Sequence, residues 1–267
     1  MSNSRVEAEA TGHLSGLDRQ VLCGFLQCNA AFVPITGNHT MESIENVLHR
    51  VTTVTFDCYG TLIDWAGGLQ GSFRALFGDA LAGRTDEMFD MYVRIEAQVE
   101  AQGYRSYRSV LAEVATQLAQ HCDVDMPAER SAELANRLPN WPPFPDTNEA
   151  LKRLKQKYRL GILSNVDRDL LAGTLQHFEV DFDFVVTAQD VESYKPAHGH
   201  FDRLLAQYAV KGELLHVAQS LFHDGNPTRE LGIAYVWINR YNDVNETIVC
   251  PCATFADLAS LATAAGV

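Results

Sequence analysis

The stretch Val54–Asp64, VTFDCYGTLID, begins as an apolar run and breaks into polar residues around Asp57. Runs of four to eight apolar residues are typical of strands that are buried on both faces of a parallel sheet. The run containing this stretch begins at Val51 and ends at Phe56. Four later runs have the same length and character, at residues 159–163, 182–187, 214–219 and 234–238.

The segments between most of these runs have the pattern of single helices. Asp146 and Thr147 are suited to cap a helix that continues to about Lys157, and Pro227 suits the first helical turn, where its missing N–H is not needed. Alternation of strands with helices is typical of α/β proteins. The sequence therefore predicts an α/β fold with a doubly wound parallel sheet.

The interval between the first two predicted strands is far longer than a single crossover connection. It contains a helical stripe of apolar residues and ends in a proline-rich stretch at residues 139–145. We predict a helical cap at residues 68–140, inserted after the first strand into a core of residues 47–67 and 141–267. The stripe consists of Met88, Met91, Tyr92, Ile95 and Val99.

Residues 1–46 precede the predicted core. The first forty residues show no clear hydrophobic period, whereas Met41 opens a segment that resembles an ordinary start just ahead of the first strand. Our hypothesis is that residues 1–40 are an appended or upstream-translated extension. The alternative is a helical arm that packs on the domain. Deletion should leave activity intact under the hypothesis, and loss of folding would contradict it.

Composition argues against several classes of function. The formal net charge of −13 disfavours binding to nucleic acid or to an anionic membrane surface. The longest apolar segments fall short of the roughly 20 residues that a membrane span requires. The six cysteines show no paired metal-ligand spacing, and Cys250-Pro-Cys252 lacks a companion cluster. These features favour reduced thiols and a cytoplasmic protein without a bound metal.

Reactive side chains follow four of the predicted strands. In an open parallel sheet, ligands bind beyond the carboxyl ends of the strands, so these side chains should be neighbours in space. Each alone has an ordinary structural explanation, such as a turn, a helix cap or a solvated loop lysine. Together they predict an active site. They are Asp57, the pair Ser164 and Asn165, Lys195, and Asp224.

The segments around these residues resemble the haloacid dehalogenase superfamily. The matching motifs are DCYGTLID at residues 57–64, LSN at 163–165, YKP at 194–196, and Asp224 ahead of LGIAYVWINR. They occur in the superfamily's order, and the similarity covers about residues 52–261, cap included. The resemblance implies a Rossmann-like core, a helical cap and an aspartate nucleophile. Most members of the superfamily are phosphatases.

Two positions favour a different reaction. Phosphatases of the superfamily place a second aspartate where this chain has Tyr59, and a phenol that titrates near pH 10 cannot replace that acid. They also carry two acids four residues apart to hold magnesium, and here Ser220 occupies the earlier position before Asp224. The pattern resembles the L-2-haloacid dehalogenase branch, whose members need no metal or other cofactor. Halide leaves without a proton, so no general acid is required.

The resemblance implies hydrolysis of small 2-haloalkanoic acids to 2-hydroxy acids through an ester on Asp57, the nucleophile. Thr61 would aim the carboxylate of Asp57, although a structural turn threonine is an equal alternative. Lys195 would orient Asp57 and favour its ionised form. Asp224 would position or activate the hydrolytic water.

Substrate-binding residues are also implied by the resemblance. Ser164 and Asn165 would hold the substrate carboxylate, and Tyr59 would lie in the pocket. Trp65 would line it too, or else be a core aromatic at the hinge of the cap. His223 would hydrogen-bond a leaving fluoride or the water, or be a loop histidine without such a role.

The cap would supply the cradle for the leaving group. Arg94 lies on a predicted cap helix, roughly where dehalogenases carry a halide-binding arginine, and an ordinary solvated arginine is an equal alternative. Arg105 or Arg108 could serve instead. The chain departs from the branch at Phe201 and Leu221, where relatives carry tyrosine and asparagine, and this leaves substrate identity open.

Four hypotheses follow. The first is the metal-independent dehalogenase, acting on a small-molecule carboxylate. The second is a magnesium-dependent phosphatase with a degraded motif, and the third is a hydrolase of a non-halogenated 2-substituted carboxylate, such as an azetidine-type ring. The fourth is a non-catalytic binding protein. A homodimer is expected only by analogy with relatives.

Overall fold

The computed structural model describes residues 42–78 and 83–267. The hypothesis about residues 1–40 lies outside this range. Within it, no helix is both long and apolar enough to cross a membrane.

The strands of the described residues form one six-stranded sheet in the order β3-β2-β1-β4-β5-β6, and every neighbouring pair is parallel. This confirms the predicted α/β sheet and its five strands. The sixth, β6, was not predicted. The strands are β1 (Thr53–Phe56), β2 (Arg159–Ser164), β3 (Phe184–Thr187), β4 (Leu214–Ala218), β5 (Ala234–Ile238) and β6 (Ala253–Phe255).

The central strands bury both faces, as their apolar runs predict. All residues of β1 and β4 are buried. Phe56, the last residue of β1, pairs with Ile162 of β2 and Val217 of β4. This register aligns the carboxyl ends of the three strands, so the loops that follow them meet at one edge of the sheet.

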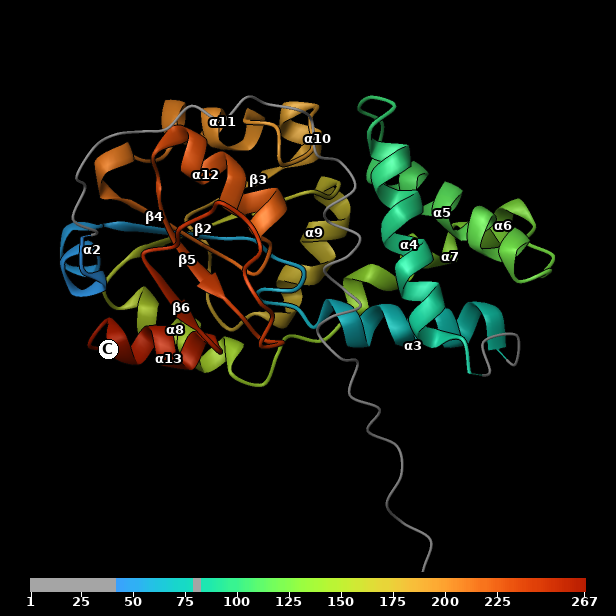
Figure 1. The fold of residues 1–267 in the computed structure, drawn as a ribbon, viewed down its shortest axis with the longest axis horizontal. Coiled ribbons are helices and arrows are strands. Elements are labelled where there is room, and N and C mark those ends of the chain that lie inside the picture. Colours follow the sequence, from blue (N-terminus) through green and yellow to red (C-terminus); the bar gives the residue numbers. More distant parts are fainter. Residues whose placement is uncertain (1–41, 79–82) are drawn as a thin grey trace, which may run out of the picture.

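Helices cover both faces of the sheet, with α11 and α12 on one side and α8 and α13 on the other (Figure 1). Pro227 lies in the first turn of α12, as predicted, whereas Asp146 precedes α8 without capping it. The core helices are α2 (Ile44–Arg50), α8 (Thr147–Lys155), α9 (Arg168–Thr174), α10 (Ala188–Val191), α11 (Gly199–Gln207), α12 (Asn226–Leu231) and α13 (Leu258–Ala264), with 3-10 turns η3 (Leu175–His177) and η4 (Lys211–Glu213) and the π-turn η5 (Leu221–Gly225).

A group of helices fills the long interval between β1 and β2 and lies beside the core (Figure 1). The first begins at Trp65, three residues before the predicted boundary, because Asp64 accepts a hydrogen bond from the Gly67 N–H and caps it. The helices of this cap are α3 (Trp65–Phe77), α4 (Thr85–Glu100), α5 (Tyr107–His121), α6 (Ala128–Ser131), α7 (Glu133–Arg137) and the 3-10 turn η2 (Leu138–Asn140).

The apolar stripe predicted for α4 forms much of the interior of the cap. Met88, Tyr92, Ile95 and Val99 are buried, while Met91 is partly buried. Their spacing of three and four residues places them on one face of the helix. The cap therefore has an apolar interior of its own, and another face of α4 is left to meet the core.

The two segments that join cap and core run side by side. Ile63 and Pro143 form an isolated antiparallel bridge. Asp64 N–H donates to Pro142 O at 2.8 Å, and Phe144 N–H donates to Leu62 O at 3.1 Å. We call residues 62–64 and 142–144 the strap.

Arg240, which follows β5, fastens the strap to the core. Its guanidinium donates to Thr61 O and to the Asp146 carboxylate, and lies 3.8 Å from the centre of the Phe144 ring. The Asp146 carboxylate accepts hydrogen bonds from Arg240 and from Leu258 N–H, which explains why it does not cap α8.

Candidate active site

Asp57 lies in the loop after β1, where its carboxylate is held by Thr61. The Thr61 hydroxyl donates to Asp57 Oδ2 at 3.1 Å and accepts from the Gln219 N–H at 3.0 Å. Because the amide occupies a lone pair of the hydroxyl oxygen, the hydroxyl proton is left for Asp57. The Thr61 side chain is therefore in contact with the predicted nucleophile.

Lys195 bridges the two predicted acids. Its ammonium donates to Asp57 Oδ1 at 2.9 Å, Asp224 Oδ1 at 2.6 Å and Leu163 O at 2.9 Å. The lysine side chain is only 1% exposed, so it needs an acceptor for each of its three N–H groups, and it has all three. The structure thus brings together three side chains that are far apart in the sequence.

Asn165 holds the backbone of this lysine. Its Oδ1 accepts from Lys195 N–H at 2.7 Å, and its Nδ2 donates to Lys195 O at 3.0 Å. Asn165 lines the cavity described below, but its amide is engaged on both sides. In this arrangement it positions Lys195, and the second N–H of its amide nitrogen is left for another acceptor.

His216, in the middle of β4, was not singled out in the sequence. Its Nε2 lies 2.8 Å from Asp224 Oδ1, and its Nδ1 lies 2.9 Å from Thr55 Oγ1. Lys195 and His216 therefore share one oxygen of Asp224. The other oxygen, Oδ2, is buried and makes no hydrogen bond with the described residues. A polar atom in this state is suited to hold a water molecule or a ligand group.

The charges of the three central groups are interdependent. Burial raises the pKa of Asp57; Lys195 lowers it, and the charge on Asp224 raises it. Burial also tends to raise the pKa of Asp224, but Lys195 and His216 outweigh it, and this pKa is lowered. The two carboxylates raise the pKa of Lys195 despite its burial. Lys195 thus favours ionised Asp57, as predicted, but without bringing its pKa below the ordinary value.

The π-turn η5 places the residues around Asp224. The N–H groups of Asp224 and Gly225 both point to Ser220 O, at 3.2 and 3.1 Å. Such wide turns occur frequently at functional sites. The His223 ring lies 3.1 Å from Ser220 Oγ through Nδ1 and lines the cavity. Burial lowers the pKa of His223 to about 4, so the imidazole is neutral at pH 7.

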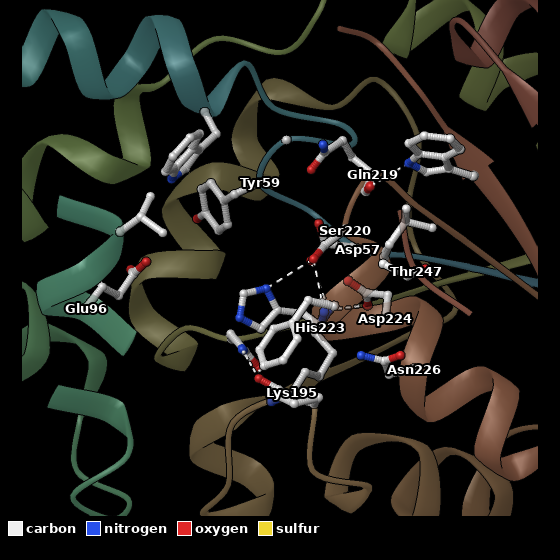
Figure 2. A pocket seen from close by; sticks show the side chains of 18 of the residues that line it. Asp57, Tyr59, Glu96, Lys195, Gln219, Ser220, His223, Asp224, Asn226 and Thr247 are labelled. Carbon is white, nitrogen blue, oxygen red and sulfur yellow. Dashed lines mark hydrogen bonds and ion pairs between the residues drawn. The ribbon is translucent and has the colours of Figure 1, made fainter. Parts of the chain in front are cut away.

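A cavity of about 1160 Å³ separates these residues from the cap. Figure 2 shows Asp57, Lys195 and Asp224 on the core wall and Glu96, from α4, on the opposite wall. Tyr59 and Trp65 also line it. The cavity is large enough for a small organic substrate.

Tyr59 and Trp65 each have a second contact that explains their place. The Tyr59 hydroxyl lies 2.7 Å from Thr174 Oγ1, and burial raises the pKa of the phenol well above its ordinary value. Tyr59 is therefore a neutral wall residue. The Trp65 ring packs edge-on against Phe89 and Tyr92 of α4, so it belongs both to the cap interior and to the cavity wall.

The cap arginines are not at the cavity. Arg94 is exposed and its Nε donates to Asp90 O, one turn earlier on the same helix. The cavity-facing positions of α4 are Phe89, Val93, Glu96 and neighbours at helical spacing, and Arg94 falls one residue off this face. Arg108 is paired with Asp169. The predicted Arg94 and its alternatives Arg105 and Arg108 are therefore not among the residues that line the cavity in this structure.

Ser164 is the last residue of β2, and its hydroxyl is buried without a hydrogen-bond partner among the described residues. It does not line the cavity, although Asn165 beside it does. Two acids on the cap wall, Glu96 and Glu100, were also not predicted from the sequence. Two acids four residues apart on an amphipathic helix are typical of a solvent-exposed face. Only the structure shows that this face of α4 lines the cavity.

The donor set for a metal is sparse. Among the described residues, no group of three or more His, Cys, Asp or Glu side chains is placed to hold an ion. Gln219 and Ser220 stand where a second acid would accompany Asp224, and the Lys195 ammonium lies between Asp57 and Asp224. The side chains of this site therefore fit an internal cation better than a magnesium ion.

Comparison with known proteins gives the family. Residues 51–217 match the haloacid dehalogenase-like hydrolase family. The match covers more than half of the chain, and the protein belongs to the haloacid dehalogenase-like hydrolase family. It is accordingly a hydrolase, as the sequence predicted.

The similar proteins include dehalogenases and a magnesium-bound hydrolase. The chain is 25% identical over 205 residues to an (S)-2-haloacid dehalogenase of Pseudomonas putida, covering 73% of this chain and 87% of that one. The L-2-haloacid dehalogenase from Xanthobacter autotrophicus with chloropropionic acid covalently bound has a TM-score of 0.69 at 17% identity, over 80% and 97% of the chains. The HAD-hydrolase YfnB from Bacillus subtilis, bound to magnesium, has 0.69 at 18%, over 82% and 100%. These two likenesses show the fold.

Proposed function

We propose that the protein is a metal-independent hydrolase that displaces halide from C2 of a small carboxylic acid through an ester on Asp57. The observation that carries the proposal is the geometry of Asp57, which Thr61 and Lys195 hold from two sides while Tyr59 stands where a phosphatase needs an acid. The dehalogenase from Pseudomonas putida and the covalent complex from Xanthobacter autotrophicus support it.

In the first step, a carboxylate oxygen of Asp57 attacks C2 from the side opposite the carbon–halogen bond. A C–O bond forms, and the halogen leaves with the electron pair of the broken bond as halide. No proton is transferred, so the neutral Tyr59 is no obstacle. His223, whose ring is neutral, is the proposed hydrogen-bond donor to the leaving group or to the water.

In the second step, water attacks the Asp57 carbonyl carbon and the acyl–oxygen bond breaks. Asp224 Oδ2, buried and free of described partners, takes a proton from the water, while Lys195 stabilises the negative charge on Asp57 Oδ1. The alkoxide that leaves takes up a proton. The products are a 2-hydroxy acid with inverted configuration, halide and one proton.

The test is halide release from chloroacetate, fluoroacetate and both enantiomers of 2-chloropropionate, with EDTA present. We expect EDTA-resistant release that Asp57→Asn abolishes. A single turnover in ¹⁸O-labelled water should place the label in Asp57 before it appears in product, because water attacks the ester carbonyl. Label that enters the product directly would contradict the ester mechanism.

A magnesium-dependent phosphatase is the second candidate, favoured by the likeness to the magnesium-bound hydrolase YfnB. Phosphate release from an aryl phosphate should be measured in parallel, with magnesium. Magnesium-dependent phosphate release without any halide release would replace the dehalogenase proposal by this one.

A further inference from the structure

The cavity wall is strongly acidic. Among the described residues that line it, eight are aspartate or glutamate, and Lys195 is the single lysine or arginine. That lysine already contacts two carboxylates. A simple haloalkanoate is an anion, and these described lining residues offer its carboxylate no lysine or arginine that is not already paired.

The acids of the cap wall are built into the structure. Glu96 Oε1 accepts hydrogen bonds from the Tyr92 hydroxyl at 2.7 Å and from the Tyr107 hydroxyl at 2.6 Å. Both tyrosines are buried. Figure 2 shows the carboxyl group of Glu96 directed into the cavity from α4. Glu100 lines the cavity one turn later on the same helix.

The two acids carry unequal charge. Burial raises the pKa of Glu96, and the two tyrosine hydroxyls oppose this by stabilising its ionised form. Burial and the neighbouring Glu96 raise the pKa of Glu100 to about 9. Glu100 is therefore neutral at pH 7, while the two tyrosine hydroxyls that donate to Glu96 Oε1 favour the carboxylate form of Glu96, which is the form that accepts hydrogen bonds from a cation.

An independent feature of the same cavity also points to a ligand. Asp224 Oδ2, on the core wall, is buried without a described hydrogen-bond partner. Unpaired buried oxygens are costly unless water or a ligand completes them. The described part of the cavity thus has one unpartnered oxygen at the core wall and a fixed acceptor at the cap wall.

We infer that the substrate carries a protonated nitrogen, which Glu96 and Glu100 bind while Asp57 attacks the carbon next to the carboxylate. The substrate class is a zwitterionic 2-substituted carboxylic acid with an ammonium group. This inference rests on the proposed displacement by Asp57. Under this inference, the cap does not bind the halide through an arginine. It selects a cationic group of the substrate through its two glutamates.

The test compares three substrates of one carbon skeleton. They are 2-chloropropionate, 3-amino-2-chloropropionate and 2-chloro-3-hydroxypropionate, which matches the amino compound in size without its charge. We expect kcat/KM for halide release to be greater for the amino compound than for either analogue, by about tenfold or more for a desolvated charge pair.

Glu96→Gln keeps the shape of the side chain and removes its charge, so it should bring this preference close to one. Tyr107→Phe, which removes one of the two hydroxyls that stabilise the Glu96 carboxylate, serves if Glu96→Gln does not fold, and it should lower the preference. The matched control is Glu113→Gln on α5, because Glu113 is exposed and contacts Gln117. The control should retain the full preference.

The outcomes separate the two proposals. Equal release from all three substrates, unchanged by Glu96→Gln, would overturn the inference and leave the dehalogenase proposal intact. No release from any substrate would refute the dehalogenase proposal. In that case, calorimetric titration with β-alanine and propionate tests the preference for a cationic ligand without the reaction. Tighter binding of β-alanine that is lost in Glu96→Gln would support the inference. Equal binding of the two compounds would refute it.

Discussion

Asp224 is held through one of its oxygens by two neighbours, Lys195 and His216, and this division of contacts defines a role for His216. The histidine lies behind the acid and does not line the cavity. We therefore expect it to be a positioning residue, which holds Asp224 through Oδ1 and leaves Oδ2 without a described partner. Its loss should affect the second step more than the first.

We expect His216→Leu to lower kcat by about 10- to 100-fold, less than the ~10²–10⁴ that a general base itself supplies. The ester on Asp57 should then accumulate, visible as a mass increase of the intact protein, while halide release in a single turnover stays near the wild-type rate. His216→Gln, which keeps a donor, should restore much of kcat. Equal slowing of both steps would contradict the positioning role.

Single residues also mark how far sequence can lead. Asp57, Lys195 and Asp224 were predictable because parallel strands bring their carboxyl ends together whatever the loops do. His216 was missed because one histidine inside an apolar strand looks like any core residue. Arg94 lies one helical position from the cavity-lining Val93, a rotation of about 100° that a stripe of apolar residues does not fix to that precision.

At the scale of elements, the packing of α3 against Trp141 gives a sharp test. A Cβ added to Gly68 would lie 2.2 Å from Trp141 Cγ, whereas one added to Gly71, on the same helix, meets nothing within 4 Å. Alanine alone favours a helix over glycine by about 1 kcal/mol. Gly71→Ala should therefore stabilise the protein slightly.

Gly68→Ala should instead destabilise it by about 1–3 kcal/mol, because Trp141 is buried and its Nε1 donates to Ser72 Oγ. Trp141 and Tyr59 pack edge-on at the cavity wall, so KM should also change. Urea unfolding of both variants measures the stabilities. Equal effects of the two substitutions would show that α3 is free to shift.

Among the elements, β6 could not be predicted from its residues. Ala253–Phe255 is a three-residue edge strand without a buried residue, so it has no apolar run, and only its pairing with β5 defines it. The π-turn is similar, since its extra residue leaves no mark in the hydrophobic pattern. Long buried strands and the stripe of α4 were predictable because burial on a fixed face repeats along the chain.

At the scale of the whole molecule, stability should depend on pH through two opposing groups. His200 is buried, and burial lowers its pKa to about 3. The unfolded histidine takes up a proton near pH 6.5, so each pH unit below that value costs the folded state up to ~1.4 kcal/mol. Glu100 acts in the opposite direction. Because its pKa is raised to about 9 in the folded protein, the folded state loses stability as pH rises from 4.5 toward 9.

Thermal unfolding between pH 3 and 9 tests both signs. Relative to wild type, His200→Gln should gain stability as pH falls below 6.5, and Glu100→Gln should gain it as pH rises above 4.5. Each variant is the control for the other because the expected slopes are opposite. Parallel curves for wild type and both variants would show that neither group is held away from its ordinary pKa.

The strap has a consequence for how such proteins diverge. Its two segments leave and re-enter the core as hydrogen-bonded neighbours, with Arg240 clamping both from the core. For the α/β core, the whole cap is therefore equivalent to a short loop whose two ends are held together by hydrogen bonds. Insertions, deletions or replacement of entire cap helices can occur beyond that closure without altering the register of the sheet. An unchanged catalytic core can therefore be combined with new caps that select other substrates.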